Sequence, residues 1–371
     1  MLSYLVDLGR VAQYLRNGER VRATLTSPAG DLRFLGQVRR GLLPLPTDRY
    51  PDAVHPFPEA TERVVDSLAG RRVAVVATGG SGALASVVGV ARFLEEAGIT
   101  PVGYGVCSGS AFFSIPLAAG LPAQEVASIT SALRPRDYLD PDWLALVTAP
   151  LTLARGWSGV IRGDALEASF RRVLGDLTLG ELRTPVWFPL WNIEDNRLMY
   201  VGSDTHPDLP AARAVRMAVA LPLAMEAVPF EDGWWLDGGI VDILPAQPFI
   251  DNDLCDVAIV VNGFYAEGFE PDREPSWRES PLSVLRVASQ TRLMHHIQLT
   301  RRSIESLRAA VPDVVELTPV DYSRVHGAGL YGEFLDNRRW PAYMARGYRA
   351  TVDALAPAPR ADPGAGAASG A

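Results

Sequence analysis

The stretch "RRVAVVATGGSGALASVVGVARFLEEAGITPVGYGVCSGSAFFSIPLAAG", residues 71–120, decides the fold that we expect for this chain. It opens with an apolar run, Val73–Ala77, that is typical of a strand buried on both faces of a parallel sheet. A glycine turn and an amphipathic helix follow, and Gly98 ends that helix. The pattern then repeats, with a strand in "ITPVGYGV" and a helix in "SAFFSIPLAAG". This repetition predicts a wound α/β sheet.

The rest of the chain continues the same alternation. Further strands are expected in residues 184–193, 196–202, 230–239, 255–264 and 313–320. Helices are expected over most of 121–182 and over 207–222, 281–312 and 330–349. Ahead of residue 71 we expect an irregular arm, with a helix at Leu2–Arg16, a strand pair in 20–38 and a proline-rich connector at 42–58.

Composition narrows the class of protein. The 371 residues are 48% hydrophobic, which is enough for a large core. A net charge of -8 argues against nucleic acid as the main partner. All 35 basic residues are arginine, which excludes lysine-based chemistry, and the two cysteines are too few for a disulfide framework or a cysteine metal site. No signal peptide and no apolar run of about 18 residues is seen, so we expect a cytoplasmic protein.

The second strand ends in Gly105-Val106-Cys107-Ser108-Gly109, a Gly-x-nucleophile-x-Gly frame. A nucleophile at a tight strand-to-helix turn projects from the backbone, and the glycines Gly105 and Gly109 of this nucleophile elbow leave room for substrate. Cys107 is in register with the frame. Ser108 is not, because its own flanks at two residues are Val106 and Ser110. The alternative interpretation is that Cys107 is an inert buried thiol.

Two more glycine turns carry candidate residues. In "TGGSG", residues 78–82, backbone N–H groups at a helix N-terminus could hold a phosphate or the oxyanion of a tetrahedral intermediate, or form a plain turn. In "WLDGGIVDILP", residues 235–245, the carboxylate of Asp237 could serve as a general base, or form an ordinary Asp-Gly turn. Asp242 is the nearby rival of Asp237.

Taken in this order, the three motifs resemble those of patatin-like phospholipases, and the resemblance covers roughly residues 72–265. It implies an α/β three-layer sandwich, with a mainly parallel central sheet flanked by helices. It also implies a dyad of Cys107 as nucleophile and Asp237 as base, without histidine, cofactor or metal. The oxyanion donors would be the backbone amides of Gly79, Gly80, Ser81 and Gly82. The resemblance divides the chain into an N-terminal arm (1–70), a catalytic domain (71–320), a C-terminal helical extension (321–355) and a disordered tail (356–371).

Two departures from the family pattern shape the expected activity. The family has serine where this chain has Cys107, and the oxyanion turn lacks the usual arginine. An acyl-cysteine is a thioester, which gives up its acyl group to amines, alcohols and thiols more readily than an ester does. We therefore expect an acyl hydrolase or acyltransferase acting on an acyl ester or thioester. The substrate would be a lipid, an acyl-CoA or a carrier-bound acyl chain. Contact with a membrane surface stays open.

Two alternatives remain. One is an esterase or thioesterase with a Cys-His-Asp triad, for which His326 is the best candidate histidine and a surface-loop role the competing interpretation. The other is a patatin-like binding protein without catalytic activity, which the cysteine and the altered glycine turn both permit.

Overall fold

The computed structural model describes residues 55–142, 148–149, 151–264, 283–320 and 337–355. The helix and strand pair expected near the N-terminus, the disordered tail and His326 lie outside these residues. Within the described residues, no helix is both long and apolar enough to cross a bilayer.

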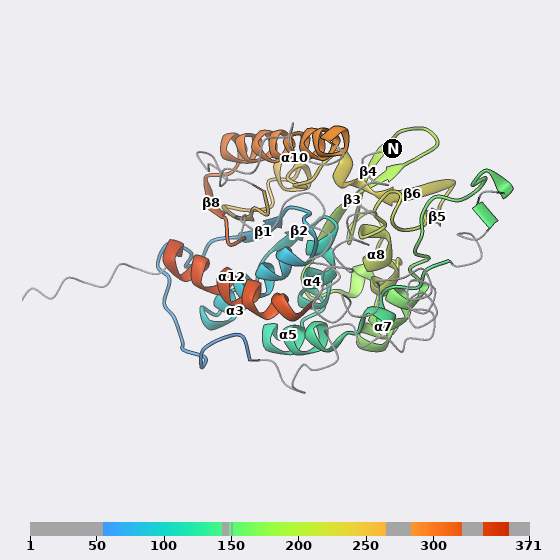
Figure 1. Ribbon diagram of the computed structural model, residues 1–371. Helices are drawn as coiled ribbons and strands as arrows, with labels where there is room; N and C mark the ends of the chain where they lie inside the picture. Colours follow the sequence, from blue (N-terminus) through green and yellow to red (C-terminus); the bar gives the residue numbers. More distant parts are fainter. Residues whose placement is uncertain (1–54, 143–147, 150, 265–282, 321–336, 356–371) are drawn as a thin grey trace, which may run out of the picture.

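An eight-stranded sheet forms the centre of the fold, in the order β5-β6-β3-β2-β1-β7-β8, with β4 paired to β3 (Figure 1). β1 pairs in parallel with β2 and β7, β2 with β3, and β7 with β8, whereas β4 and β6 run antiparallel to β3, and β5 to β6. The strands are β1 Val73–Ala77, β2 Gly103–Gly105, β3 Val186–Asn192, β4 Leu198–Gly202, β5 Val228–Phe230, β6 Gly233–Asp237, β7 Val257–Val261 and β8 Asp313–Leu317. The expected α/β fold with a mainly parallel sheet is confirmed.

Helices cover both faces of the sheet. The α-helices are α3 Ser86–Glu96, α4 Gly109–Ala118, α5 Ala123–Ala132, α7 Asp164–Leu174, α8 Ala211–Ala218, α9 Gln247–Asp251, α10 Ser283–Ala310 and α12 Trp340–Leu355. Figure 1 shows α10 on one face and α3, α5 and α12 on the other. The 3-10 helices are η1 Ser81–Ala85, η2 Pro135–Asp137, η3 Leu179–Glu181, η4 Gly238–Ile240 and η6 Asn337–Arg339.

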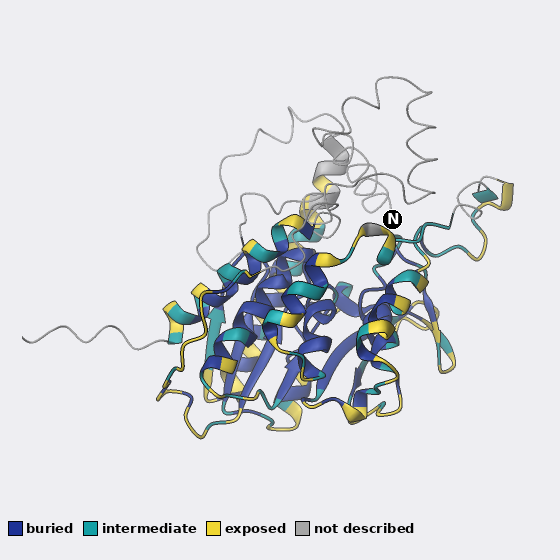
Figure 2. Cartoon of the chain, turned by 90° about the horizontal axis from the view of Figure 1, so that it is seen from below, coloured by how far each residue is buried: buried dark blue, intermediate teal, exposed yellow. Residues whose placement is uncertain are grey.

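β1 explains why the first apolar run became a central strand. Val73, Val75 and Ala77 pack into the larger core cluster with α3, α4 and α12. The alternate residues, Ala74 and Val76, pack into a second cluster with side chains of α9 and α10. A strand buried on both faces needs apolar residues at every position, because side chains alternate between the faces. Figure 2 shows the result, with the interior buried and exposed residues confined to the outside.

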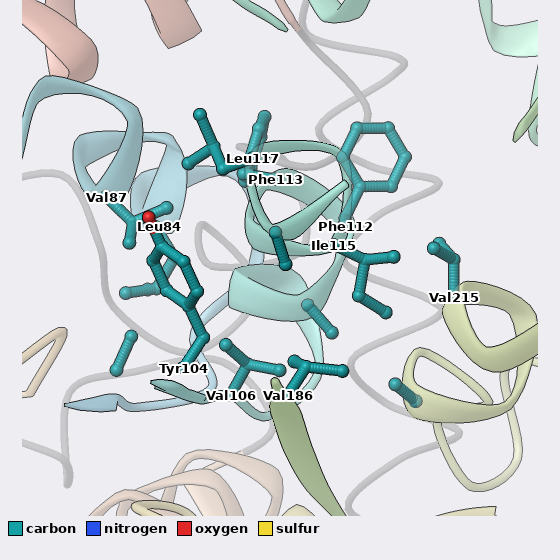
Figure 3. Packing of buried hydrophobic residues seen from close by; sticks show 14 of the residues in the cluster. Leu84, Val87, Tyr104, Val106, Phe112, Phe113, Ile115, Leu117, Val186 and Val215 are labelled. Atoms are coloured by element: carbon teal, nitrogen blue, oxygen red, sulfur yellow. The ribbon is translucent and has the colours of Figure 1, made fainter. Parts of the chain in front are cut away.

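α4 is the buried helix that follows the second strand, and every one of its residues is buried. Phe112 and Phe113 make edge contacts with Trp340 of α12. Figure 3 shows the packing around α4, where Val106 and Val186 of the sheet and Val215 of α8 surround it. This packing holds the start of α4, and therefore the turn before it, in a fixed place.

Two helix predictions need correction. Among the described residues of 121–182, α5 and α7 do not form one continuous helical region, because the chain leaves the α-helix between them, where Pro135 and Pro141 occur. The C-terminal helix was expected at 330–349, but α12 begins only at Trp340, after η6. The residues 321–336 before it are outside the described part.

Candidate active site

Three turns at one edge of the sheet bring the predicted motifs together. β1 and β2 run parallel, so the turns after Ala77 and Gly105 lie at the same edge. β3 connects these turns to Asp237, because Trp187 of β3 pairs with Gly105 of β2, and Leu190 of β3 pairs with Asp237 at the end of β6. As a result, the Cys107 thiol donates to the Asp237 carboxylate, with Sγ 3.6 Å from Oδ1, across 130 residues of sequence.

Cys107 is enclosed. Its exposed fraction is 0%, and it packs against Ile243, Phe264 and Ile297 of α10. Burial is the first cause that raises the pKa of the thiol well above its usual range, and Asp237 and Asp242 raise it further. The Gly79 amide acts in the opposite direction but is the smaller effect. The sulfur is therefore held as a neutral thiol.

Ser108, the residue next in the chain, has the strained backbone of the turn, with φ 51° and ψ −123°. Neither Gly105 nor Gly109 has a positive φ. Ser108 is the N-cap of α4 and is partly exposed. Its side chain lowers the pKa of the Asp237 carboxyl, with a larger effect than the Gly239 amide or the Cys107 thiol. A non-glycine residue in this conformation is strained, and such strain is concentrated at functional turns.

The Asp237 carboxylate is 2% exposed. It is the N-cap of η4 and accepts a hydrogen bond from the Gly239 amide at 2.8 Å. Burial raises its pKa from 3.8 to about 6, against the opposing effect of its hydrogen bonds. Gly239 has to be small, because a Cβ there would lie 2.9 Å from the Cys107 sulfur. At pH 7 the Asp237 carboxylate is thus mostly ionised, and its pKa is close enough to neutrality for it to accept a proton from a neighbouring group.

The glycine turn after β1 borders the same place. A Cβ at Gly79 would lie 3.3 Å from the Ser108 Cβ, so the turn and the serine are neighbours. The Gly79 amide itself donates to the Ile243 carbonyl at 2.9 Å and is not a free donor. Gly80 has φ 144°, which requires glycine, and precedes η1. The first N–H groups of a helix have no partner within it, and Gly80, Ser81 and Gly82 stand at the start of η1.

A sequence match to a known family spans these turns. Residues 75–250 match the family model described as "Patatin-like phospholipase". Over this range the chain is similar to that family. The matched range contains Gly79–Gly82, Cys107, Ser108 and Asp237.

The individual relatives are distant. The chain is 25% identical over 226 residues to "Lysophospholipase NTE1" from two strains of Cryptococcus neoformans, a match that covers 60% of this chain and 13% of the relative. Among solved structures, VipD from Legionella pneumophila is 13% identical, with a TM-score of 0.42, over 77% of this chain and 66% of VipD. The complex of SpcU with ExoU from Pseudomonas aeruginosa matches at 14% identity and a TM-score of 0.31, over 68% of this chain and 53% of that one.

A second carboxylate, that of the partly buried Asp242, lies near Cys107 and Asp237 and was only partly anticipated. Asp242 accepts hydrogen bonds from the Tyr200 hydroxyl, the Leu244 amide at 3.3 Å and the Ser303 hydroxyl at 3.5 Å. Burial raises its pKa to about 6. Asp242 is thus hydrogen-bonded to Tyr200 of β4 and Ser303 of α10, whereas Asp237 interacts with Ser108. No sequence pattern links Tyr200 or Ser303 to the site, because each is distant in sequence and lies in an unremarkable segment.

Among the described residues, no histidine is one of the groups that hydrogen-bond to Asp237. The groups that donate to Asp237 are Ser108, Gly239 and Cys107. His206 contacts Glu231 at the surface, and His295 contacts the Ile240 carbonyl. Across the described residues, no group of three or more His, Cys, Asp or Glu side chains could hold a metal ion.

Proposed function

We propose that this protein is a lipid acyl-ester hydrolase that works through a dyad of Ser108 and Asp237. The observation that carries the proposal is the backbone of Ser108, which turns its hydroxyl out of the strand and toward a buried carboxylate. The family match and the lysophospholipase relative support a lipid ester as substrate. The proposal keeps the predicted base and moves the nucleophile by one residue.

The chemistry follows from the two side chains and the glycine turn. The Asp237 carboxylate takes the proton of the Ser108 hydroxyl as the oxygen attacks the ester carbonyl. The oxyanion that forms is stabilised by the amides of Gly80, Ser81 and Gly82. Asp237 then returns the proton to the departing alcohol, which leaves an acyl-serine. Water, deprotonated by the same carboxylate, releases the fatty acid.

Cys107 is the alternative nucleophile, and acyl transfer from its thioester is the alternative function. The 3.6 Å contact between its sulfur and the Asp237 carboxylate supports Cys107 as the nucleophile. Two features favour Ser108 instead: the thiol is fully enclosed, and its raised pKa keeps the reactive thiolate scarce. Ser108 needs no thiolate, only a base within reach.

The test is to trap the acyl-enzyme with a lysophospholipid or a p-nitrophenyl acyl ester and locate the acyl group by mass spectrometry. We expect fatty acid release and an acyl group on Ser108 that resists neutral hydroxylamine, as an oxygen ester does. Acyl label on Cys107 that neutral hydroxylamine removes would instead establish the thioester route. An absence of both label and release would leave the chain as a binding protein.

We also expect the activity to depend on one ionisation near pH 6. The base must be ionised, and burial raises the pKa of Asp237 to about 6, so kcat/KM should reach a plateau above that pH. Below it, kcat/KM should fall about tenfold per pH unit as the carboxylate is protonated. A pH–rate profile with a soluble ester measures this. The Asp242→Asn variant is the control, because the pKa of Asp242 is also about 6 and loss of the transition in that variant would assign it to the wrong carboxylate.

A further inference from the structure

A segment between α5 and α7 leaves the body of the molecule on a firmly held stem. The Asp142 amide donates to the Val160 carbonyl at 2.8 Å, which closes the two ends of the segment. The amides of Val160 and Ile161 both donate to the Ala224 carbonyl, at 3.0 and 2.9 Å. A Cβ at Gly159 would lie 2.1 Å from the backbone of Met225, so the stem runs directly against the domain. The stem itself is therefore fixed to the domain.

Two leucines stand out from the end of this segment. Leu151 is 86% exposed and Leu153 is 78% exposed. The chain around them is closed by its own hydrogen bonds, from the Ala154 amide to the Ala149 carbonyl at 2.9 Å and from the Arg155 amide to the Thr152 carbonyl at 3.1 Å. Leu153 and Ala154 both have φ 53°, a strained conformation for residues other than glycine. We call residues 151–155 the leucine tip.

The charge around the tip has the opposite sign to that of the whole chain. The leucine tip contains Arg155 and no Asp or Glu, in a chain whose net charge is -8. Arg162, at the base of the segment, pairs instead with Asp140 and Asp164. Arg155 is exposed within the tip itself. Exposed leucines beside an arginine, with acidic residues excluded, complement a lipid surface that carries anionic headgroups better than they complement water.

The stem of the tip is bonded to the Ala224 carbonyl, and the Asp237 amide donates to the Ala220 carbonyl of the same loop at 2.9 Å. Figure 1 shows the segment beyond β5 and β6, with α10 over one face of the sheet. Two more exposed apolar side chains lie on elements that border the site, Met294 of α10 at 55% and Val241 beside η4 at 39%. His295 joins the two elements through its contact with the Ile240 carbonyl at 3.2 Å. A lipid surface that covered the tip would thus also approach the edge where Asp237 and Ser108 lie.

We propose that the leucine tip inserts into a lipid surface and docks the site against it. Burial of two leucine side chains in hydrocarbon supplies the affinity, and Arg155 adds attraction to anionic headgroups. The proposal rests on the proposed function only in that docking would bring the site to its lipid substrate; docking itself requires no catalysis.

The test is co-sedimentation with vesicles of phosphatidylcholine containing phosphatidylglycerol, with the full chain and the double variant Leu151→Asp/Leu153→Asp. We expect the double variant to bind at least about tenfold more weakly, because it loses the buried apolar area of both leucines. The matched control is Val64→Asp, since Val64 is 80% exposed and belongs to the segment 55–70 on the opposite side of the molecule (Figure 1). This control should bind as the parent does.

Turnover of a soluble short-chain ester keeps docking and catalysis apart. The double variant should retain that turnover and lose turnover of vesicle lipid. Equal vesicle binding by parent and double variant would overturn the docking proposal, as would a parent that does not bind vesicles. A parent dimer that the double variant converts to a monomer would also overturn it, by assigning the tip to self-association. Failure of every variant on the soluble ester would contradict the proposed hydrolase while leaving the vesicle result valid.

Discussion

Replacing Ser108 with alanine is expected to lower kcat/KM on an acyl ester by about a thousandfold or more, and replacing Cys107 with alanine by less than about tenfold. The reason is that Ser108 has the strained turn conformation and is the group that lowers the pKa of Asp237 most. Cys107 is a neutral thiol enclosed in hydrocarbon. Steady-state rates on one soluble ester, measured for both variants and the parent, check this.

Two controls make this comparison decisive. Thermal unfolding of both variants shows whether each is folded, since Cys107→Ala leaves a small buried space and is expected to cost about 1 kcal/mol. The Ser108→Cys variant separates chemistry from shape, because it places a thiol at the strained position. The reverse pattern, with Cys107→Ala inactive and Ser108→Ala active, would restore the nucleophile that the sequence frame favours.

Replacing Asp237 with asparagine is expected to abolish turnover and to stabilise the protein at the same time. The folded state raises the pKa of this carboxyl from 3.8 to about 6, so ionising it is harder in the folded chain than in the unfolded one. Stability is therefore fully present below the unfolded pKa and declines as the pH rises through about 6. Above that pH the ionised carboxylate costs about 3 kcal/mol of unfolding free energy, and asparagine removes this cost while still accepting from the Gly239 amide.

Urea unfolding at pH 8 and pH 5 measures this effect. We expect the gain in unfolding free energy of Asp237→Asn over the parent to be largest at pH 8 and to shrink at pH 5, where the folded parent is already protonated. Asp208→Asn is the matched control, because Asp208 is exposed and the same change of charge there leaves stability within about 0.5 kcal/mol. A destabilised, inactive Asp237→Asn would instead mean that the carboxylate is a structural cap of η4.

Local sequence carried most of the information about the fold. The central strands could be predicted from short apolar runs in the sequence, because a strand that is buried on both faces has few polar positions. β1 and β7 are the clearest examples, with all five residues buried in each. The region between α5 and α7 was misjudged, because Pro135 and Pro141 interrupt an α-helix there.

The site was only half visible. Motif spacing identified the three turns and the carboxylate of Asp237, and the structure brings them to one edge of the sheet. The spacing of the Gly-x-nucleophile-x-Gly motif could not distinguish Cys107 from Ser108. The motif depends only on residue positions, whereas the turn is defined by which residue takes the positive φ. It also could not reveal that Tyr200 and Ser303 surround Asp242, or that the Gly79 amide is occupied by Ile243.

The amino-acid sequence alone therefore determined the layered α/β architecture and the three glycine-rich turns, because apolar periodicity and turn chemistry act over a few neighbouring residues. Only the tertiary structure decided that Ser108 takes the positive φ and stays partly exposed, and that Cys107 is sealed in the core although it also contacts Asp237. The physical reason is that the packing of α4 and α10 sets the direction of that turn, and such packing depends on residues far apart in the chain.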